Sequence, residues 1–174
     1  MGLVSPIAAD GNEPPSFQGA NRPFTLLTPT VPAPALPIYT LQGGVTTLKR
    51  FSGKVALVNI WATWCPACLH EMPTLAKLQS QMGGATFSVV ALSIDAGGAS
   101  VVSKYLKQNG LDNLPTYLDP AARILTALKL GNALPISLIL DHQGRVMGYM
   151  KGAADWSSPD AAALIKYYIK RISP

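Results

Sequence analysis

The chain has 174 residues, 48% of them hydrophobic and 13% charged, which suits one globular domain and excludes a chain that is disordered throughout. Its formal net charge of +5 is spread along the sequence, and no basic run is interleaved with aromatic residues, so nucleic-acid binding is not expected. No apolar stretch reaches the roughly 18–20 residues needed to cross a bilayer, and no signal peptide opens the chain.

Residues 1–36 are rich in proline, glycine, serine and threonine and show no helical or strand periodicity. This composition is typical of a linker or stalk that is partly extended. We therefore expect the folded domain to occupy residues 37–174.

The folded part is predicted to open with a hairpin and a buried strand. Ile38–Leu41 and Val45–Leu48 are rich in β-forming residues and are separated by Gln42-Gly43-Gly44, a turn signature. The almost continuously apolar run Val55–Ala62 predicts a strand buried on both faces of a sheet.

A long helix is predicted from Pro66 to about Met82, with a kink at Pro73 and an end at Gly83-Gly84. Its apolar residues fall on one face: Leu69, Met72, Leu75, Ala76 and Leu78. Phe87–Ile94 then predicts a second buried strand.

The next helix should have Ser100 as its N-cap and end at Gly110. Its inward-facing residues are predicted to be Val101, Val102, Tyr105 and Leu106. Asp119-Pro120 should cap a further short helix. The apolar residues of that short helix are Ile124, Leu125 and Leu128.

Ile136–Leu140 and Arg145–Met150 flank a polar turn and predict a hairpin, and the last helix should open at Ser158. Its apolar set has helical spacing: Ala161, Leu164, Ile165 and Tyr168. Alternating strands and helices that close on an antiparallel hairpin predict an α/β fold. We expect a central mixed sheet, flanked by helices and extended by an N-terminal β-hairpin.

Two cysteines, Cys65 and Cys68, form a Cys-x-x-Cys motif where the first buried strand meets the long helix. At a helix N-terminus, unpaired N–H groups and the helix dipole favour a negative charge, which lowers a thiol pKa from about 8.5 to about 7 or below. Pro66 suits the first helical position because its missing N–H would have had no partner. The motif predicts a redox-active disulfide in which Cys65 attacks and Cys68 resolves the mixed disulfide.

Metal and cofactor sites fit these cysteines less well. A zinc site would need two more ligands, and only His70 and His142 are available, without recognisable ligand spacing. A c-type haem site requires histidine directly after the second cysteine, where Leu69 stands. We therefore predict no metal and no cofactor.

Two residues beside the motif each have two interpretations. Trp64 either fills the core or covers the dithiol. Glu71 lies one turn beyond Cys68. It is either an ordinary solvated glutamate or, where burial raises its pKa, a group that exchanges protons with the resolving thiol.

Several segments are similar to the TlpA branch of bacterial thioredoxin-like proteins, close to the ResA and CcmG groups. Phe51-Ser52-Gly53-Lys54 and the run from Val58 to Cys65 resemble the entry to the active site of that family. Cys68–Pro73 and Gly152–Trp156 continue the likeness, which covers residues 37–174.

The resemblance implies a thioredoxin-like fold with a cis peptide bond at Leu134-Pro135, held against the disulfide. By the same likeness, the residues that contact substrate would be Trp64, Pro66, Leu134 and Pro135. Asn59 stands where cytoplasmic thioredoxins carry a buried aspartate, and the glutamate that matches Glu71 is associated with thiol proton handling.

The resemblance also implies a cellular role. The protein would face the periplasm from an inner-membrane anchor that the given sequence lacks, and it would reduce disulfides of proteins that build respiratory oxidases. Its partners would be a Sco-type copper chaperone and the copper-binding oxidase subunit. Electrons would come from a membrane thiol transporter of the DsbD or CcdA type.

The chain departs from the family pattern at two places. Pro66-Ala67 is not the usual pair between the cysteines, and Ile136 replaces the common threonine after the cis-proline. Because the intervening pair helps to set thiolate stability and hence the reduction potential, the reducing direction follows less directly from the resemblance than the fold does. Three rival functions are also left open. They are a cytochrome c maturation reductase acting on apocytochrome c, a general oxidase or isomerase, and a copper-binding chaperone.

Overall fold

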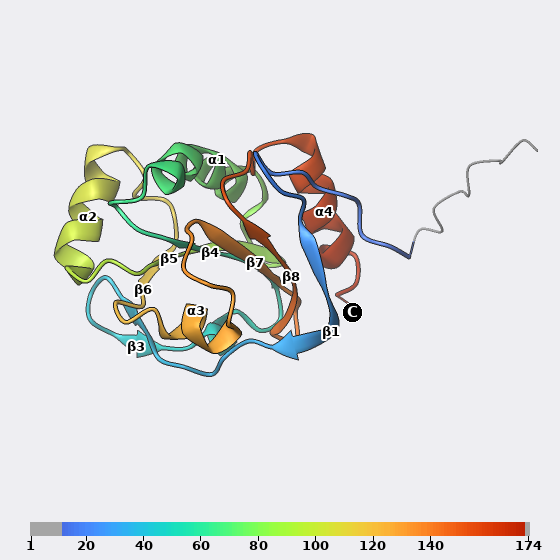
Figure 1. The fold of residues 1–174 in the computed structure, drawn as a ribbon, viewed down its shortest axis with the longest axis horizontal. Helices are drawn as coiled ribbons and strands as arrows, with labels where there is room; N and C mark the ends of the chain where they lie inside the picture. The colour runs from blue at the N-terminus through green and yellow to red at the C-terminus, as the bar shows by residue number, and fades with distance from the viewer. Residues whose placement is uncertain (1–11, 173–174) are drawn as a thin grey trace, which may run out of the picture.

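The computed structural model describes residues 12–172, which form one mixed sheet with helices on both faces (Figure 1). The strands are β1 (Thr25–Pro32), β2 (Ile38–Thr40), β3 (Val45–Thr46), β4 (Val55–Trp61), β5 (Phe87–Ser93), β6 (Thr116–Leu118), β7 (Ile136–Leu140) and β8 (Arg145–Lys151). The helices are α1 (Pro66–Met82), α2 (Gly98–Gln108), α3 (Arg123–Leu128), α4 (Pro159–Ile169) and the 3-10 helix η1 (Leu48–Phe51). Within the described residues, none of these helices has the length and apolar character to span a membrane.

The strand order is β1-β8-β7-β4-β5-β6-β2-β3. The central strands β4, β5 and β6 run parallel, whereas β7, β8 and β1 on one side and β2 and β3 on the other pair antiparallel. The expected mixed sheet with flanking helices is therefore confirmed. The predicted N-terminal hairpin is β2–β3, which extends the sheet by pairing with β6.

Alternate residues of the central strands point to two separate hydrophobic clusters, because side chains of a strand alternate between faces. The larger cluster lies under α1, α2 and α4 and includes Leu57 and Val89. The smaller cluster lies under α3 and η1 and includes Val58 and Val90. Figure 1 shows α1, α2 and α4 on one side of the sheet and α3 on the other.

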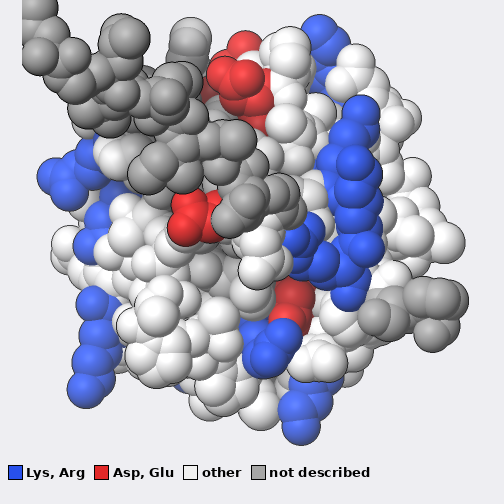
Figure 2. Space-filling view, turned by 90° about the vertical axis from the view of Figure 1, so that its right-hand side faces the viewer, with Lys and Arg blue, Asp and Glu red and all other residues white. Residues whose placement is uncertain are grey.

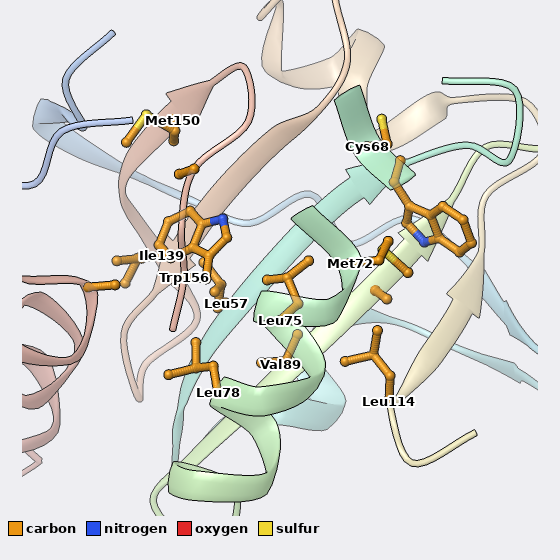
Figure 3. Close-up of a cluster of buried hydrophobic side chains, with 14 of the residues drawn as sticks. Leu57, Cys68, Met72, Leu75, Leu78, Val89, Leu114, Ile139, Met150 and Trp156 are labelled. Carbon is orange, nitrogen blue, oxygen red and sulfur yellow. The ribbon is translucent and has the colours of Figure 1, made fainter. Parts of the chain in front are cut away.

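Helix α1 has the predicted bounds and packs the predicted face. Met72, Leu75 and Leu78 are buried, and Figure 3 shows them along α1 facing Leu57 and Val89 of the sheet. The last helix also begins as predicted, with the Ser158 hydroxyl accepting a hydrogen bond from the Ala161 N–H at 3.2 Å.

Helix α2 differs from the prediction at its start. It begins at Gly98 with Gly97 as N-cap, and the Ser100 hydroxyl donates to the Gly97 carbonyl instead of capping the helix. Val101 is consequently 41% exposed, which corrects its predicted inward orientation. The short strand β6 was not predicted either, because three residues are too few to show a period.

The predicted linker over residues 1–36 is wrong for most of the part that the structure describes. Thr25–Pro32 form β1, which pairs antiparallel with β8 at the edge of the sheet. An edge strand tolerates prolines such as Pro29, since one row of its N–H groups faces away from the sheet. Phe17 is also buried, with its ring 4.9 Å from that of Trp156. The folded domain thus begins at least twenty residues before the predicted boundary, and residues 1–11 lie outside the described part.

Truncation of Phe17 tests whether this segment belongs to the folded core. Phe17→Ala should lower the free energy of unfolding by about 3 kcal/mol, because it removes a buried ring from the contact with Trp156. Leu26→Ala, at a residue that is 48% exposed on β1, should change it by less than about 0.5 kcal/mol. Urea titration of both variants measures the difference. Equal, small effects would mean that the segment does not contribute to stability.

Candidate active site

The two cysteines lie at the start of α1, just after the loop that connects β4 to this helix. Every residue of this central strand is buried, so the position of the loop that follows its C-terminal end is fixed by the sheet. Cys65 is the N-cap of α1 and Pro66 occupies its first turn, as the sequence predicts. Cys65 and Cys68 form a disulfide with a Cα–Cα distance of 5.3 Å, and the Cys68 N–H lies 3.2 Å from Cys65 Sγ. A thiolate at Cys65 would therefore accept hydrogen bonds from main-chain N–H groups in the first turn of α1.

The two sulfur-bearing residues differ in exposure. Cys65 is 7% exposed, whereas Cys68 is fully buried and lies at the start of α1 (Figure 3). The neighbouring Trp64 is 65% exposed, so it does not fill the core. Trp64 and Pro66 instead lie on the exposed surface on either side of Cys65. An incoming disulfide can therefore reach Cys65 but not Cys68.

A cis peptide bond joins Leu134 to Pro135, as expected. The Pro135 carbonyl accepts a hydrogen bond from the Gly152 N–H at 2.9 Å, which ties this loop to the end of β8. Leu134 packs against the hydrophobic cluster that includes both cysteines. Sheet pairing of β7 begins only at Ile136, and within residues 12–172 the N–H and C=O groups of Leu134 pair with no other main-chain group. These two groups are free to bind an extended peptide.

Glu71 is 1% exposed, so the interpretation as a solvated surface residue is wrong. Its Oε1 accepts from Asn59 Nδ2 of β4 at 2.6 Å, and its Oε2 accepts from the Ala154 N–H at 2.9 Å. The Asn59 amide also donates to the hydroxyl of Ser137 on β7 at 2.9 Å. The carboxylate is thus held directly by two other segments of the chain, and Ser137 supports it through Asn59, one helical turn from Cys68.

Burial raises the pKa of Glu71 from 4.5 to about 7, although the hydrogen bonds from Ala154 and Asn59 act in the opposite direction. Removal from water therefore outweighs the hydrogen-bond donors, because a buried carboxylate loses more solvation than its hydrogen bonds restore. A group with this pKa is present in both protonation states near neutral pH, which suits it to proton transfer.

The hydrogen bonds around Glu71 can accommodate either protonation state. The Asn59 amide oxygen is buried and has no hydrogen-bond partner among residues 12–172, while its NH₂ group donates to the carboxylate. Rotation of this amide by half a turn would present the oxygen to a protonated Glu71 and to the Ser137 hydroxyl. Asn59 is therefore a neutral neighbour whose side chain can either donate a hydrogen bond to Glu71 or accept one from it. An ionised aspartate at this position could only accept.

A second buried acid, Asp95, shapes the loop before the motif. It follows β5, is 3% exposed and accepts from the Thr63 N–H at 2.9 Å and from the Thr63 hydroxyl at 2.5 Å. The Ser93 hydroxyl donates to the same carboxylate at 2.7 Å. Asp95 thereby fixes the loop that ends at Trp64. The sequence analysis missed it, although an acid directly after a buried strand is a signal that could have indicated a structural role.

Sequence analysis also missed Ser137 and Ala154, since neither carries a charge or belongs to a motif. His70 and His142, the two candidate zinc ligands, do not join the cysteines: among residues 12–172, no group of three or more His, Cys, Asp and Glu side chains could hold a metal ion.

A disulfide at the N-terminus of α1, a carboxylate buried one turn further along that helix and a cis-proline loop before β7 together define a thiol–disulfide oxidoreductase with a thioredoxin-like fold. The chain belongs to the Redoxin family, whose model matches residues 10–165. The expected resemblance to the TlpA, ResA and CcmG group is confirmed by its relatives.

The thiol-disulfide oxidoreductase ResA of Bacillus thuringiensis is 29% identical over 142 residues, which cover 82% of this chain and 77% of that protein. ResA of Geobacillus kaustophilus is 28% identical over 120 residues, or 69% of this chain and 67% of that protein. The crystal structure of StoA from Bacillus subtilis matches with a TM-score of 0.61 at 19% identity, over 78% of this chain and 98% of StoA. The similarity to ResA supports protein-disulfide reductase activity.

The raised pKa of Glu71 predicts how stability depends on pH. Because the folded protein holds this proton more tightly than the unfolded chain, the free energy of unfolding should fall as pH rises from 4.5 to about 7 and then level off. The loss attributable to Glu71 should be about 3 kcal/mol. Urea titrations of the oxidised protein across this range should show that fall, and Glu71→Gln should show a flatter curve. Parallel curves for the two proteins would contradict the raised pKa.

Proposed function

We propose that this protein is a periplasmic dithiol reductant, held at the inner membrane by an anchor, which reduces disulfides of proteins that assemble the copper centre of cytochrome oxidase. The observation that carries the chemistry is the placement of Cys65 at the N-cap of α1 with Cys68 buried behind it. The cellular role is supported by the resemblance to the TlpA branch. The proposed partners are a Sco-type chaperone, the oxidase copper subunit and a DsbD- or CcdA-type electron donor.

In the first step the more exposed cysteine, Cys65, reacts with the substrate. In the reduced protein, the Cys65 thiolate attacks one sulfur of the substrate disulfide, and the electron pair of the broken S–S bond leaves with the other substrate sulfur. The helix N-terminus stabilises the Cys65 thiolate before attack. The free main-chain groups of Leu134 would hold the substrate as an extended segment, with Trp64, Pro66 and Pro135 around it.

The second step releases the substrate. Cys68 must lose its proton, attack the Cys65 sulfur of the mixed disulfide and expel the second substrate thiol. Cys68 is fully buried, so water is a poor acceptor for that proton. Glu71 lies one turn away with a pKa near neutrality, and in our proposal it takes the proton from Cys68. The rotatable amide of Asn59 would then accept a hydrogen bond from the protonated carboxyl.

The reduction potential tests the direction of the reaction and the role of Glu71 together. We expect a potential near the roughly −270 mV of thioredoxin, far below the roughly −120 mV of DsbA. Because Glu71 exchanges a proton with the dithiol, the curves of potential against pH for the wild type and Glu71→Gln should diverge around pH 7. Equilibration with glutathione or dithiothreitol at several pH values provides both curves.

A potential close to that of DsbA would overturn the reductive direction and favour an oxidase or isomerase. Superimposable curves would remove Glu71 from the thiol chemistry while leaving the reductase assignment intact. Asp155→Asn provides a matched control, since Asp155 is an exposed acid in the segment that also contains Ala154.

Trapping of mixed disulfides in cells tests the proposed partners. In Cys68→Ser, Cys65 can still attack but no thiol resolves the product, so substrates should accumulate as covalent adducts that reductant releases. We expect copper-centre assembly proteins among the adducts, identified by mass spectrometry. Cys65→Ser should trap none of them.

Two other sets of adducts would contradict the proposed role. Adducts limited to apocytochrome c would assign the protein to cytochrome c maturation, and a broad set of newly secreted proteins would indicate a general oxidase. If the reduced protein binds copper stoichiometrically and tightly, and Cys68→Ser loses this binding, the chaperone alternative is favoured.

A further inference from the structure

A cavity of about 350 Å³ lies beside the cis-proline loop, apart from the dithiol. It is lined by the segment that leads into Leu134, by part of the N-terminal segment and by the end of β8. The lining residues that bear on binding are Asn21, Arg22, Asn132, Leu134 and Lys151.

The charge of this cavity is of one sign. Arg22 and Lys151 line it, and no Asp or Glu of the described residues does. Neither cation forms an ion pair within residues 12–172, and Lys151 Nζ instead lies over the ring of Tyr149, 5.5 Å from its centroid. The amides of Asn21 and Asn132 add hydrogen-bond donors to the same walls. The lining therefore includes two cationic residues that form no ion pair among the described residues, together with amide donors, a combination that suits a carboxylate.

The position of Arg22 is fixed by main-chain hydrogen bonds. Its carbonyl accepts from the Gly19 N–H at 2.8 Å, and the Ala20 N–H donates to the Ala153 carbonyl at 2.9 Å. The N-terminal segment is thus attached to the loop that follows β8, next to Lys151. The two cations consequently belong to neighbouring parts of the structure, although they are far apart in the sequence.

The cavity also adjoins the place where the reaction would occur. Leu134 is shared: it helps to line the cavity, it packs against the cluster that contains both cysteines, and its main-chain groups pair with no other main-chain group of the described residues. An extended substrate paired with Leu134 would continue past the dithiol, and side chains on one side of its cysteine would reach the cavity.

We propose that this cavity selects substrate proteins that carry an Asp or Glu on one side of the cysteine that forms the mixed disulfide with Cys65. Arg22 and Lys151 bind the acidic side chain, and Leu134 holds the main chain. This inference rests on the proposed function, because it concerns the substrate segment that Cys65 attacks. Arg22 and Lys151 thereby act as residues that determine specificity and leave the thiol chemistry to the dithiol.

Non-specific electrostatic attraction between a basic protein and an acidic peptide would give a different pattern of rates from binding in the cavity. Figure 2 shows Lys and Arg side chains scattered over the face that carries α4 and β1, with Asp and Glu between them. Such scattered charges would favour an acidic peptide wherever its acid stands. A bound acid in a cavity on one side of Leu134 favours only peptides whose acid stands on the matching side of the cysteine.

The test uses Cys68→Ser protein, reduced at Cys65, and short peptides whose single cysteine is disulfide-bonded to thionitrobenzoate. Attack of the Cys65 thiolate on the peptide sulfur forms the mixed disulfide, breaks the activated S–S bond and releases coloured thionitrobenzoate with its electron pair. In the peptide series, one Asp is moved from two residues before the cysteine to two residues after it. Matched peptides carry Asn or Lys at each position.

We expect one side of the cysteine to show about tenfold faster attack for Asp than for Lys at low salt, with the ratio shrinking as salt is added. Arg22→Glu and Lys151→Glu should each reverse the preference on that side. Lys107→Glu is the matched control, because it makes the same charge change on α2 outside the cavity.

Equal rates for Asp and Lys peptides, or a preference that is independent of the side, would overturn the inference. So would equal effects of Lys107→Glu and the two cavity variants. In each of these results the Asn peptides are still attacked, so the oxidoreductase chemistry would stand. Failure of Cys65 to attack any peptide would instead contradict the proposed function itself.

Discussion

The buried carboxylate of Glu71 connects the parts of the chain that form the active site. It projects from α1, accepts hydrogen bonds from Asn59 of β4 and from the Ala154 N–H before α4, and lies one turn beyond Cys68. Leaving such a group without donors would cost several kcal/mol, so the helix, the strand and the loop must reach their positions together. The proton affinity next to the resolving thiol is consequently a property of the whole fold, which no local motif determines.

The elements that could be predicted from the sequence are those with strong local signals. The continuous apolar run of β4, the proline and cysteines at the start of α1 and the capping serine of α4 each indicate a structure from a few neighbouring residues. The same is true of the attacking and resolving cysteines, because both lie in one turn of one helix. For Glu71 the sequence left two interpretations open, since its burial depends on Ala154, a partner 83 residues away.

The elements that could not be predicted owe their structure to distant contacts. Strand β1 contains prolines and lacks an alternating pattern, and it becomes a strand because β8 offers it an edge to pair with. Phe17 is buried in the larger hydrophobic cluster, where its ring contacts that of Trp156, 139 residues later in the chain. Composition describes the average tendency of a segment, and in this N-terminal region a single aromatic contact and one strand pairing outweigh that tendency.

The N-terminal segment affects the active site because its residues line two cavities next to the loop after β8. Gln18, Gly19 and Ala20 line a cavity that also includes Glu71 and Ala154, whereas Arg22 lines the basic cavity beside Leu134. A β-carbon at Gly19 would lie 2.7 Å from Met150 Sδ and 3.0 Å from the Arg22 carbonyl oxygen, so the segment fits closely where only glycine is accommodated without a shift. Any displacement of it would move Arg22 and, through the bond between Ala20 and Ala153, the loop whose N–H binds Glu71. A segment whose composition suggests a tether therefore helps to set both the environment of the buried carboxylate and the surface that a substrate would meet.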